Sequence, residues 1–165
     1  MKPAASLAFL AAALALSACG KSPAPVAETA AKGQSFLALN AHSTGVITLP
    51  SGLEYRVLHS GPPTGLKPKL ADEVKVDYEG KLLDGEIFDS SYQRGAPAVL
   101  TVRELVPGWQ EALQRMRPGD EWLIYLPAKL GYGDKAVGPI PSGSVLTFKL
   151  DLIGVLPDAT SVGNG

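Results

Sequence analysis

Apolar and polar side chains alternate along several short segments from about residue 45 onward, which is the pattern of half-buried strands. The alternation is clearest at residues 74–78 and 146–152. A continuous apolar run at residues 122–126 is consistent with a central strand. The Asp84-Gly85 pair predicts a hairpin turn, because Asp-Gly tolerates positive φ. Further strands are predicted at residues 53–58, 87–88 and 99–102.

One helix is predicted among these strands. Its apolar stripe, at helical spacing, consists of Trp109, Ala112, Leu113 and Met116. Pro107-Gly108 opens the helix and Pro118-Gly119 ends it. The pattern therefore predicts an α+β fold, in which a curled antiparallel β-sheet of about five strands wraps around one short α-helix.

The N-terminal part of the chain has a different pattern. Residues 7–16 form an apolar run that is too short to span a bilayer, and Leu16-Ser17-Ala18-Cys19 follows, which resembles a bacterial lipoprotein cleavage box. We predict a lipoprotein signal peptide at residues 1–18 and lipidation of Cys19. The alternative is a plain secretory signal followed by an unrelated cysteine. Gly20 after the cysteine favours the outer membrane over inner-membrane retention.

Residues 19–44 are predicted to be the lipidated cysteine and a flexible tether, because small and polar residues dominate residues 20–35. Residues 35–40 could form one or two helical turns, and a longer helix is not expected here. The folded domain is expected at residues 45–157 and a disordered tail at residues 158–165.

Composition and charge exclude several classes of protein. A chain of 165 residues with 45% hydrophobic residues and a net charge of −1 fits one globular domain, and it argues against nucleic-acid binding through phosphate contacts. One cysteine and two histidines offer neither an intrachain disulfide nor a metal site, and no cofactor is expected. The chain also lacks a nucleophile elbow, a phosphate loop and a dinucleotide glycine pattern. After these exclusions, the remaining possibility is a reaction in which no covalent bond is made or broken.

Six short motifs occur in one order along the folded part of the chain. These are Val76-Asp77-Tyr78-Glu79-Gly80, Asp84-Gly85-Glu86-Ile87-Phe88-Asp89-Ser90-Ser91, Val106-Pro107-Gly108-Trp109, Leu130-Gly131-Tyr132-Gly133, Ile140-Pro141 and Leu146-Thr147-Phe148. Together they resemble the FKBP family of peptidyl-prolyl cis-trans isomerases, and most of all its branch of bacterial macrophage infectivity potentiator-like proteins. The resemblance extends from about Leu49 to Leu156 and implies an FKBP-like fold for the predicted domain.

The resemblance also implies roles for individual residues. The catalytic residues are expected to be Tyr78, Asp89 and Tyr132. The substrate-binding residues are expected to be Phe88, Leu105, Val106, Trp109, Ile140 and Phe148. Trp109 would lie under the proline ring, while the Ile140 N–H and the Tyr132 hydroxyl would donate to substrate carbonyls. Arg94 would support Asp89 through a salt bridge.

An aromatic, water-poor pocket suits this reaction on physical grounds. An X–Pro bond rotates slowly because its partial double bond imposes a barrier of about 18–20 kcal/mol. Twisting the amide removes its resonance and reduces its dipole, so an apolar pocket favours the twisted form over the planar one. Each ~1.4 kcal/mol of that preference gives about tenfold in rate.

Each candidate residue also has a structural interpretation. Trp109 and Phe148 could be ordinary core residues, because both lie on apolar faces of predicted elements. Asp89 could cap a turn before the two serines, and Arg94 could be solvated. Tyr132 lies between two glycines, where packing alone gives little reason for a tyrosine.

The predicted function is therefore a peptidyl-prolyl isomerase of exported proteins, anchored to the cell envelope by its lipid and facing the periplasm from the outer membrane. Its expected partners are proline-containing polypeptides, with immunosuppressive macrolides as inhibitors. Contact with the membrane is expected only through the anchor, and a monomer is expected because the long N-terminal dimerising helix of other relatives is missing. The alternatives are a non-catalytic lipoprotein that binds a proline-bearing partner, and a purely structural envelope protein.

Overall fold

The computed structural model describes residues 25–158, so the predicted signal peptide and Cys19 lie outside the described residues. The helices are α1 (Pro25–Asn40), α2 (Ser91–Arg94) and α3 (Pro107–Leu113), with short 3-10 turns η1 (Val102–Glu104) and η2 (Ala128–Leu130). The strands are β1 (Val46–Thr48), β2 (Glu54–His59), β3 (Glu73–Lys81), β4 (Ile87–Ser90), β5 (Ala98–Thr101), β6 (Glu121–Leu126) and β7 (Leu146–Leu156).

All of these strands belong to one antiparallel sheet, in the order β1-β2-β6-β7-β3-β4, with β5 also paired to β3. The sheet has seven strands instead of the expected five or so, and the three-residue edge strand β1 is the one without a counterpart among the predicted strands. The apolar run at residues 122–126 lies in β6 between β2 and β7, as a central strand should. Gly85, at φ +92°, forms the predicted hairpin between β3 and β4.

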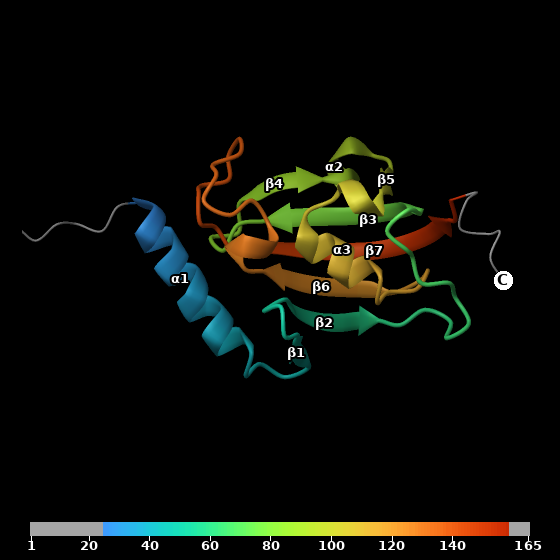
Figure 1. Cartoon of the computed structure of the whole chain (residues 1–165), viewed down its shortest axis with the longest axis horizontal. Coiled ribbons are helices and arrows are strands. Elements are labelled where there is room, and N and C mark those ends of the chain that lie inside the picture. The colour runs from blue at the N-terminus through green and yellow to red at the C-terminus, as the bar shows by residue number, and fades with distance from the viewer. Residues whose placement is uncertain (1–24, 159–165) are drawn as a thin grey trace, which may run out of the picture.

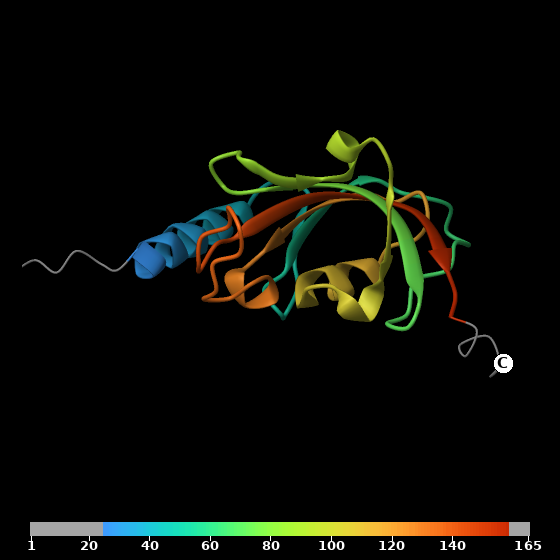
Figure 2. The same cartoon turned by 90° about the horizontal axis from the view of Figure 1, so that it is seen from above.

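The single predicted core helix, α3, lies in the hollow of the curved sheet (Figures 1 and 2). Trp109, Ala112 and Leu113 are buried there against β3, β6 and β7. The helix ends at Leu113, earlier than the apolar stripe predicted, and the chain tightens into a turn in which the Met116 N–H donates to Leu113 O. Met116 nevertheless remains fully buried in the same core. The α+β fold class is therefore confirmed.

The prediction of a flexible tether was wrong for residues 25–40, which form the 16-residue helix α1 along one side of the domain (Figure 1). Its inward face consists of Thr29, Ala30, Gly33, Phe36, Leu37 and Asn40. Gly33 packs against Val145, where a Cβ would come within 2.6 Å of Val145 Cγ2. Because only Phe36 and Leu37 on this face are large and apolar, it carries no hydrophobic stripe that sequence periodicity could detect.

Both ends of the folded unit differ from the expected residues 45–157. The folded unit begins before residue 45, because the Phe36 ring packs against Tyr125 in a tilted arrangement with ring centroids 5.8 Å apart. At the other end, Asp158 is not part of a disordered tail, since its N–H donates to Asp72 Oδ1 at 3.0 Å; residues 159–165 lie outside the described residues. The expected monomer stays a prediction. Within residues 25–158, no helix is both long and apolar enough to cross a bilayer.

Candidate active site

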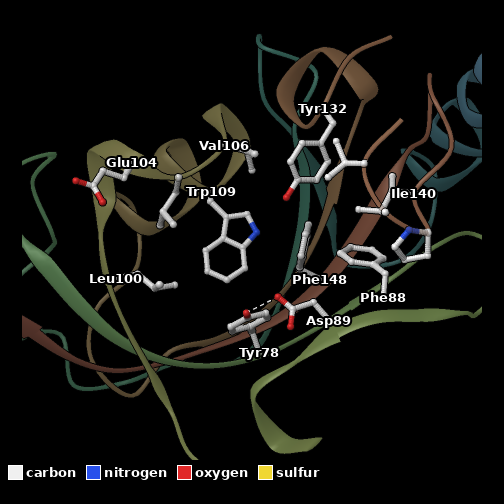
Figure 3. Close-up of a pocket in the computed structure, with 14 residues that line it drawn as sticks. Tyr78, Phe88, Asp89, Leu100, Glu104, Val106, Trp109, Tyr132, Ile140 and Phe148 are labelled. Carbon is white, nitrogen blue, oxygen red and sulfur yellow. Dashed lines mark hydrogen bonds between the residues drawn. The ribbon is translucent and has the colours of Figure 1, made fainter. Parts of the chain in front are cut away.

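A cavity of about 470 Å³ opens between α3, the sheet and the loop that follows η2 (Figure 3). It is lined by Tyr78, Phe88, Asp89, Leu100, Glu104, Leu105, Val106, Trp109, Tyr132, Val137, Gly138, Pro139, Ile140 and Phe148. All nine predicted catalytic and substrate-binding residues are in this set, although they come from six separate segments of the chain. The tertiary structure therefore brings them together around one groove.

Four aromatic rings form the inner walls of the groove. The Trp109 indole, only 4% exposed, lies edge-to-face against Tyr78 at 5.1 Å and against Phe148 at 5.2 Å between ring centroids. Phe88 meets Phe148 edge-to-face at 5.4 Å. Edge-to-face contacts of this kind stabilise ring pairs beyond their burial, so the walls are held in one arrangement.

Gly80 on β3 makes room for two of these rings. It pairs with Phe148 of β7 on one side and with Asp89 of β4 on the other. A Cβ at this position would lie 2.7 Å from atoms of both Phe88 and Phe148, closer than side chains can pack. The Tyr78-Glu79-Gly80 motif thus needs glycine at its third position for steric reasons.

Asp89 lies at the edge of the groove in a hydrogen-bonded group with Tyr78 and Arg94. The Tyr78 hydroxyl donates to Asp89 Oδ2 at 2.5 Å, Arg94 Nη2 donates to the Tyr78 oxygen at 2.8 Å, and Arg94 Nη1 forms the predicted ion pair with Asp89 Oδ1. Burial alone would raise the pKa of Asp89, but the hydrogen bonds from Tyr78 and Arg94 outweigh it, and the pKa lies below its usual value. Burial and the bond to Asp89 raise the pKa of Tyr78. Asp89 is therefore an ionised carboxylate at neutral pH, with Tyr78 as a neutral donor.

The two serines after Asp89 hold this group in place. Ser90 caps α2, accepting from the Gln93 N–H at 3.3 Å, so the cap is Ser90 and not Asp89. The Ser91 hydroxyl accepts from the Tyr78 N–H at 2.9 Å and donates to Asp77 Oδ1 at 2.6 Å. The Asp-Ser-Ser motif thereby fixes the end of β4 and α2 to β3, and with them the carboxylate of Asp89.

Tyr132 and the hairpin at residues 137–140 cover the opposite side of the groove. Tyr132 is 37% exposed, and its hydroxyl points into the cavity (Figure 3). The predicted role of the Ile140 N–H as a donor to substrate was wrong, because this N–H donates to Val137 O at 2.9 Å inside the hairpin. Gly138, at φ +54°, lets the hairpin turn this tightly. Ile140 lines the groove with its side chain instead.

Sequence reasoning missed a second possible donor, the N–H of Val106. Val106 is the N-cap of α3, and the N–H groups at a helix N-terminus have no partner inside the helix. No acceptor is found for it within residues 25–158. Pro107 could have indicated this donor, since a proline at the first position of a helix marks the residue before it, here Val106, as the N-cap. The other lining residues that were missed are Leu100, Glu104, Val137, Gly138 and Pro139.

The described part of the chain contains no group of three or more His, Cys, Asp or Glu side chains that could hold an ion. The groove can therefore be understood from its rings, its donors and one paired carboxylate.

Comparison with known proteins agrees with this geometry. Residues 65–153 match the family of FKBP-type peptidyl-prolyl cis-trans isomerases, and residues 9–57 match the domain amino-terminal to that isomerase. The chain is 49% identical to "Peptidyl-prolyl cis-trans isomerase Mip" of Coxiella burnetii over 127 residues, covering 76% of this chain and 54% of that protein. It is 46% identical to "Outer membrane protein MIP" of Legionella longbeachae over 129 residues, covering 78% and 54%.

Solved structures show the same likeness. The crystal structure of FkpA from Escherichia coli superposes with a TM-score of 0.77 at 38% identity, covering 80% of this chain and 61% of that one. A peptidyl-prolyl isomerase structure from Pseudomonas syringae superposes with a TM-score of 0.74 at 33% identity, covering 82% and 99%. The chain belongs to the FKBP family of peptidyl-prolyl cis-trans isomerases. Its sequence fits the Mip-like branch of that family, and it spans about half the length of the curated relatives named above.

Proposed function

We propose that this protein is an active peptidyl-prolyl cis-trans isomerase of exported polypeptides. The observation that carries the proposal is the groove itself, in which Tyr78, Phe88, Trp109 and Phe148 surround an apolar space of about 470 Å³. That volume accommodates a proline ring together with the bond before it. The aromatic walls exclude water from the imide and so favour its twisted, less polar form.

The polar groups of the groove act by positioning and by charge. The Tyr132 hydroxyl and the Val106 N–H are available to donate to substrate carbonyls on either side of the twisting bond. Asp89 has a lowered pKa and is held by Tyr78 and Arg94, so it acts on the imide as a fixed negative charge and transfers no proton. No covalent bond is made or broken.

A prolyl-peptide isomerisation assay tests this proposal. Wild-type protein should accelerate the reaction, and Tyr132→Phe and Asp89→Ala should each lower kcat/KM by about tenfold, as expected for loss of one electrostatic or hydrogen-bonding contact. Tyr92→Phe is the matched control, because Tyr92 is an exposed tyrosine of α2 outside the groove. An inert wild type, or full activity in both groove variants, would instead favour the non-catalytic binding protein.

The pH profile tests the proposed role of Asp89. Its pKa is lowered and that of Tyr78 is raised, so neither group changes charge in the neutral range. The kcat/KM should therefore stay constant across neutral pH and fall only when Asp89 is protonated in strong acid. A bell-shaped profile centred near neutrality would show acid–base catalysis and contradict this mechanism.

We also propose that the protein works in the cell envelope, anchored through a lipid on Cys19 to the outer membrane and facing the periplasm. The support is the apolar run at residues 7–16, the cleavage-box resemblance before Cys19, and a relative named as an outer membrane protein. Immunosuppressive macrolides are proposed to bind in the same groove. Metabolic labelling with a clickable fatty acid should mark the wild type and not Cys19→Ser, and an unlabelled wild type would refute the anchor.

A further inference from the structure

Two charged side chains line the groove, and both are carboxylates. The charge of Asp89 is balanced by its ion pair with Arg94. Glu104 has no such partner, because none of the ion pairs within residues 25–158 includes it. Glu104 therefore carries the uncompensated charge of the groove lining.

The backbone that carries Glu104 is firmly held. Glu104 ends η1, and the Gln110 side chain donates to the carbonyl oxygens on both sides of it, to Arg103 at 3.1 Å and to Leu105 at 2.7 Å. The Arg103 N–H donates in turn to Leu70 O at 2.9 Å. The backbone of Glu104 is therefore fixed, and its exposed carboxylate points outward at the rim of the groove, away from Trp109 (Figure 3).

Glu104 also marks one end of the groove. In Figure 3 it lies beyond Leu100, on the far side of Trp109 from Ile140. An adjacent cavity shares Glu104 with the groove and is also lined by the charged residues Glu73, Arg103 and Asp158. Acids outnumber bases at this end, whereas the lining at the Ile140 end consists of Val137, Gly138, Pro139 and Ile140.

We propose that Glu104 is a specificity-determining residue, which makes the groove prefer clients with a Lys or Arg close to the proline and disfavour Asp or Glu there. The inference rests on the proposed isomerase function and adds a substrate class to it. An exposed ion pair contributes modestly, so the preference between a basic and an acidic peptide is expected to be about threefold at low ionic strength. Salt should weaken it, because the interaction takes place at the surface.

The test uses short prolyl peptides that differ only in one residue, Lys, Gln or Glu, placed two positions before or two positions after the proline. Turnover is measured by exchange NMR without a coupling protease, since a protease would itself discriminate between charges. Peptide affinity is measured by NMR titration on the same samples. The variants are Glu104→Gln and Glu104→Lys, with Glu28→Gln on α1 as the control for an equal loss of net charge far from the groove.

Wild type and Glu28→Gln should show the Lys-over-Glu preference in at least one peptide position. Glu104→Gln should reduce it to about one, and Glu104→Lys should invert it. An unchanged preference in Glu104→Gln, with turnover intact, would overturn the role of Glu104 and leave the isomerase function standing. If no peptide is turned over but Glu104 still controls which peptides bind, the proposed isomerase function is refuted and the role of Glu104 in specificity stands. If no peptide binds, both proposals are refuted.

Discussion

Trp109 is both a core residue and a groove residue. It packs with Ala112 and Leu113 in the main hydrophobic cluster, yet its indole also borders the cavity. The structural and the functional interpretation of Trp109 are therefore compatible, because a side chain that contacts a ligand must be held in place by packing on its other side. The same holds for Phe148, which alternates inward on β7 and also forms a wall of the groove.

At the residue scale, the sharpest steric requirement lies at Gly80. Gly80→Ala should lower the free energy of unfolding by about 1–3 kcal/mol and weaken peptide binding, because the new Cβ would displace the rings of Phe88 and Phe148. Urea unfolding and peptide titration measure the two effects. Gly154→Ala on β7 is the control, since nothing lies within 4 Å of a Cβ there. Equal stability of the two variants would show that the rings can move aside.

At the scale of elements, α1 contacts the domain along its length, through Gly33 on Val145, Phe36 on Tyr125 and Asn40 at its C-terminal end. Asn40 Nδ2 donates to Glu54 Oε2 at 2.7 Å, and Glu54 is only 3% exposed. Burial raises the pKa of Glu54, against the lowering effect of this hydrogen bond. Asn40 therefore serves two purposes, since it satisfies a buried carboxyl group and fixes the end of the helix.

Asn40→Ala should release α1 from the domain. It leaves Glu54 without its partner, and an unsatisfied buried polar group costs about 1–3 kcal/mol. Hydrogen exchange should show faster exchange along α1, with the central strands β3, β6 and β7 still protected. Leu39→Ala, at a neighbouring position that is 75% exposed, should leave α1 protected. Equal protection of α1 in both variants would mean that Gly33 and Phe36 alone hold the helix.

At the scale of the whole molecule, the convex face of the sheet carries a row of carboxylates. Asp77 on β3 pairs with Asp151 on β7, and Asp151 pairs with Glu121 on β6. Burial, and then the negative charges of Glu121 and Asp77, raise the pKa of Asp151. Lys149 compensates in part through its ion pair with Glu121 at 3.2 Å. Like charges directly opposite each other destabilise a sheet, so this row opposes folding at neutral pH.

Asp151→Asn should therefore stabilise the protein at neutral pH by about 0.5–1 kcal/mol. A carboxyl group whose pKa is higher in the folded than in the unfolded state favours folding when protonated, so wild-type stability at this site rises as pH falls through the folded pKa. The advantage of the variant should then shrink in acid. Urea unfolding at neutral and acidic pH measures this, with Glu86→Gln in an exposed turn as the control. An equal gain at both pH values would contradict the coupling.

The α+β class, the central strand at residues 122–126, the core helix and nine of the fourteen groove residues could be predicted from the sequence. Each depends on local information, either an apolar period of two or 3.6 residues or motif residues at set spacings. The helix α1 could not be predicted in this way, because its inward face mixes small, polar and a few large apolar residues. Its contacts with Val145, Tyr125 and Glu54 exist only in the folded protein.

The tertiary structure also decided which backbone donors are free and which charges are paired. The Ile140 N–H is used by its own hairpin, while the Val106 N–H at the start of α3 has no acceptor among residues 25–158. The roles of Glu104 and of the carboxylate row depend on neighbouring residues that are distant in the sequence. Periodicity records which side chains avoid water, whereas hydrogen bonding and charge depend on what the fold places within a few ångströms of each group.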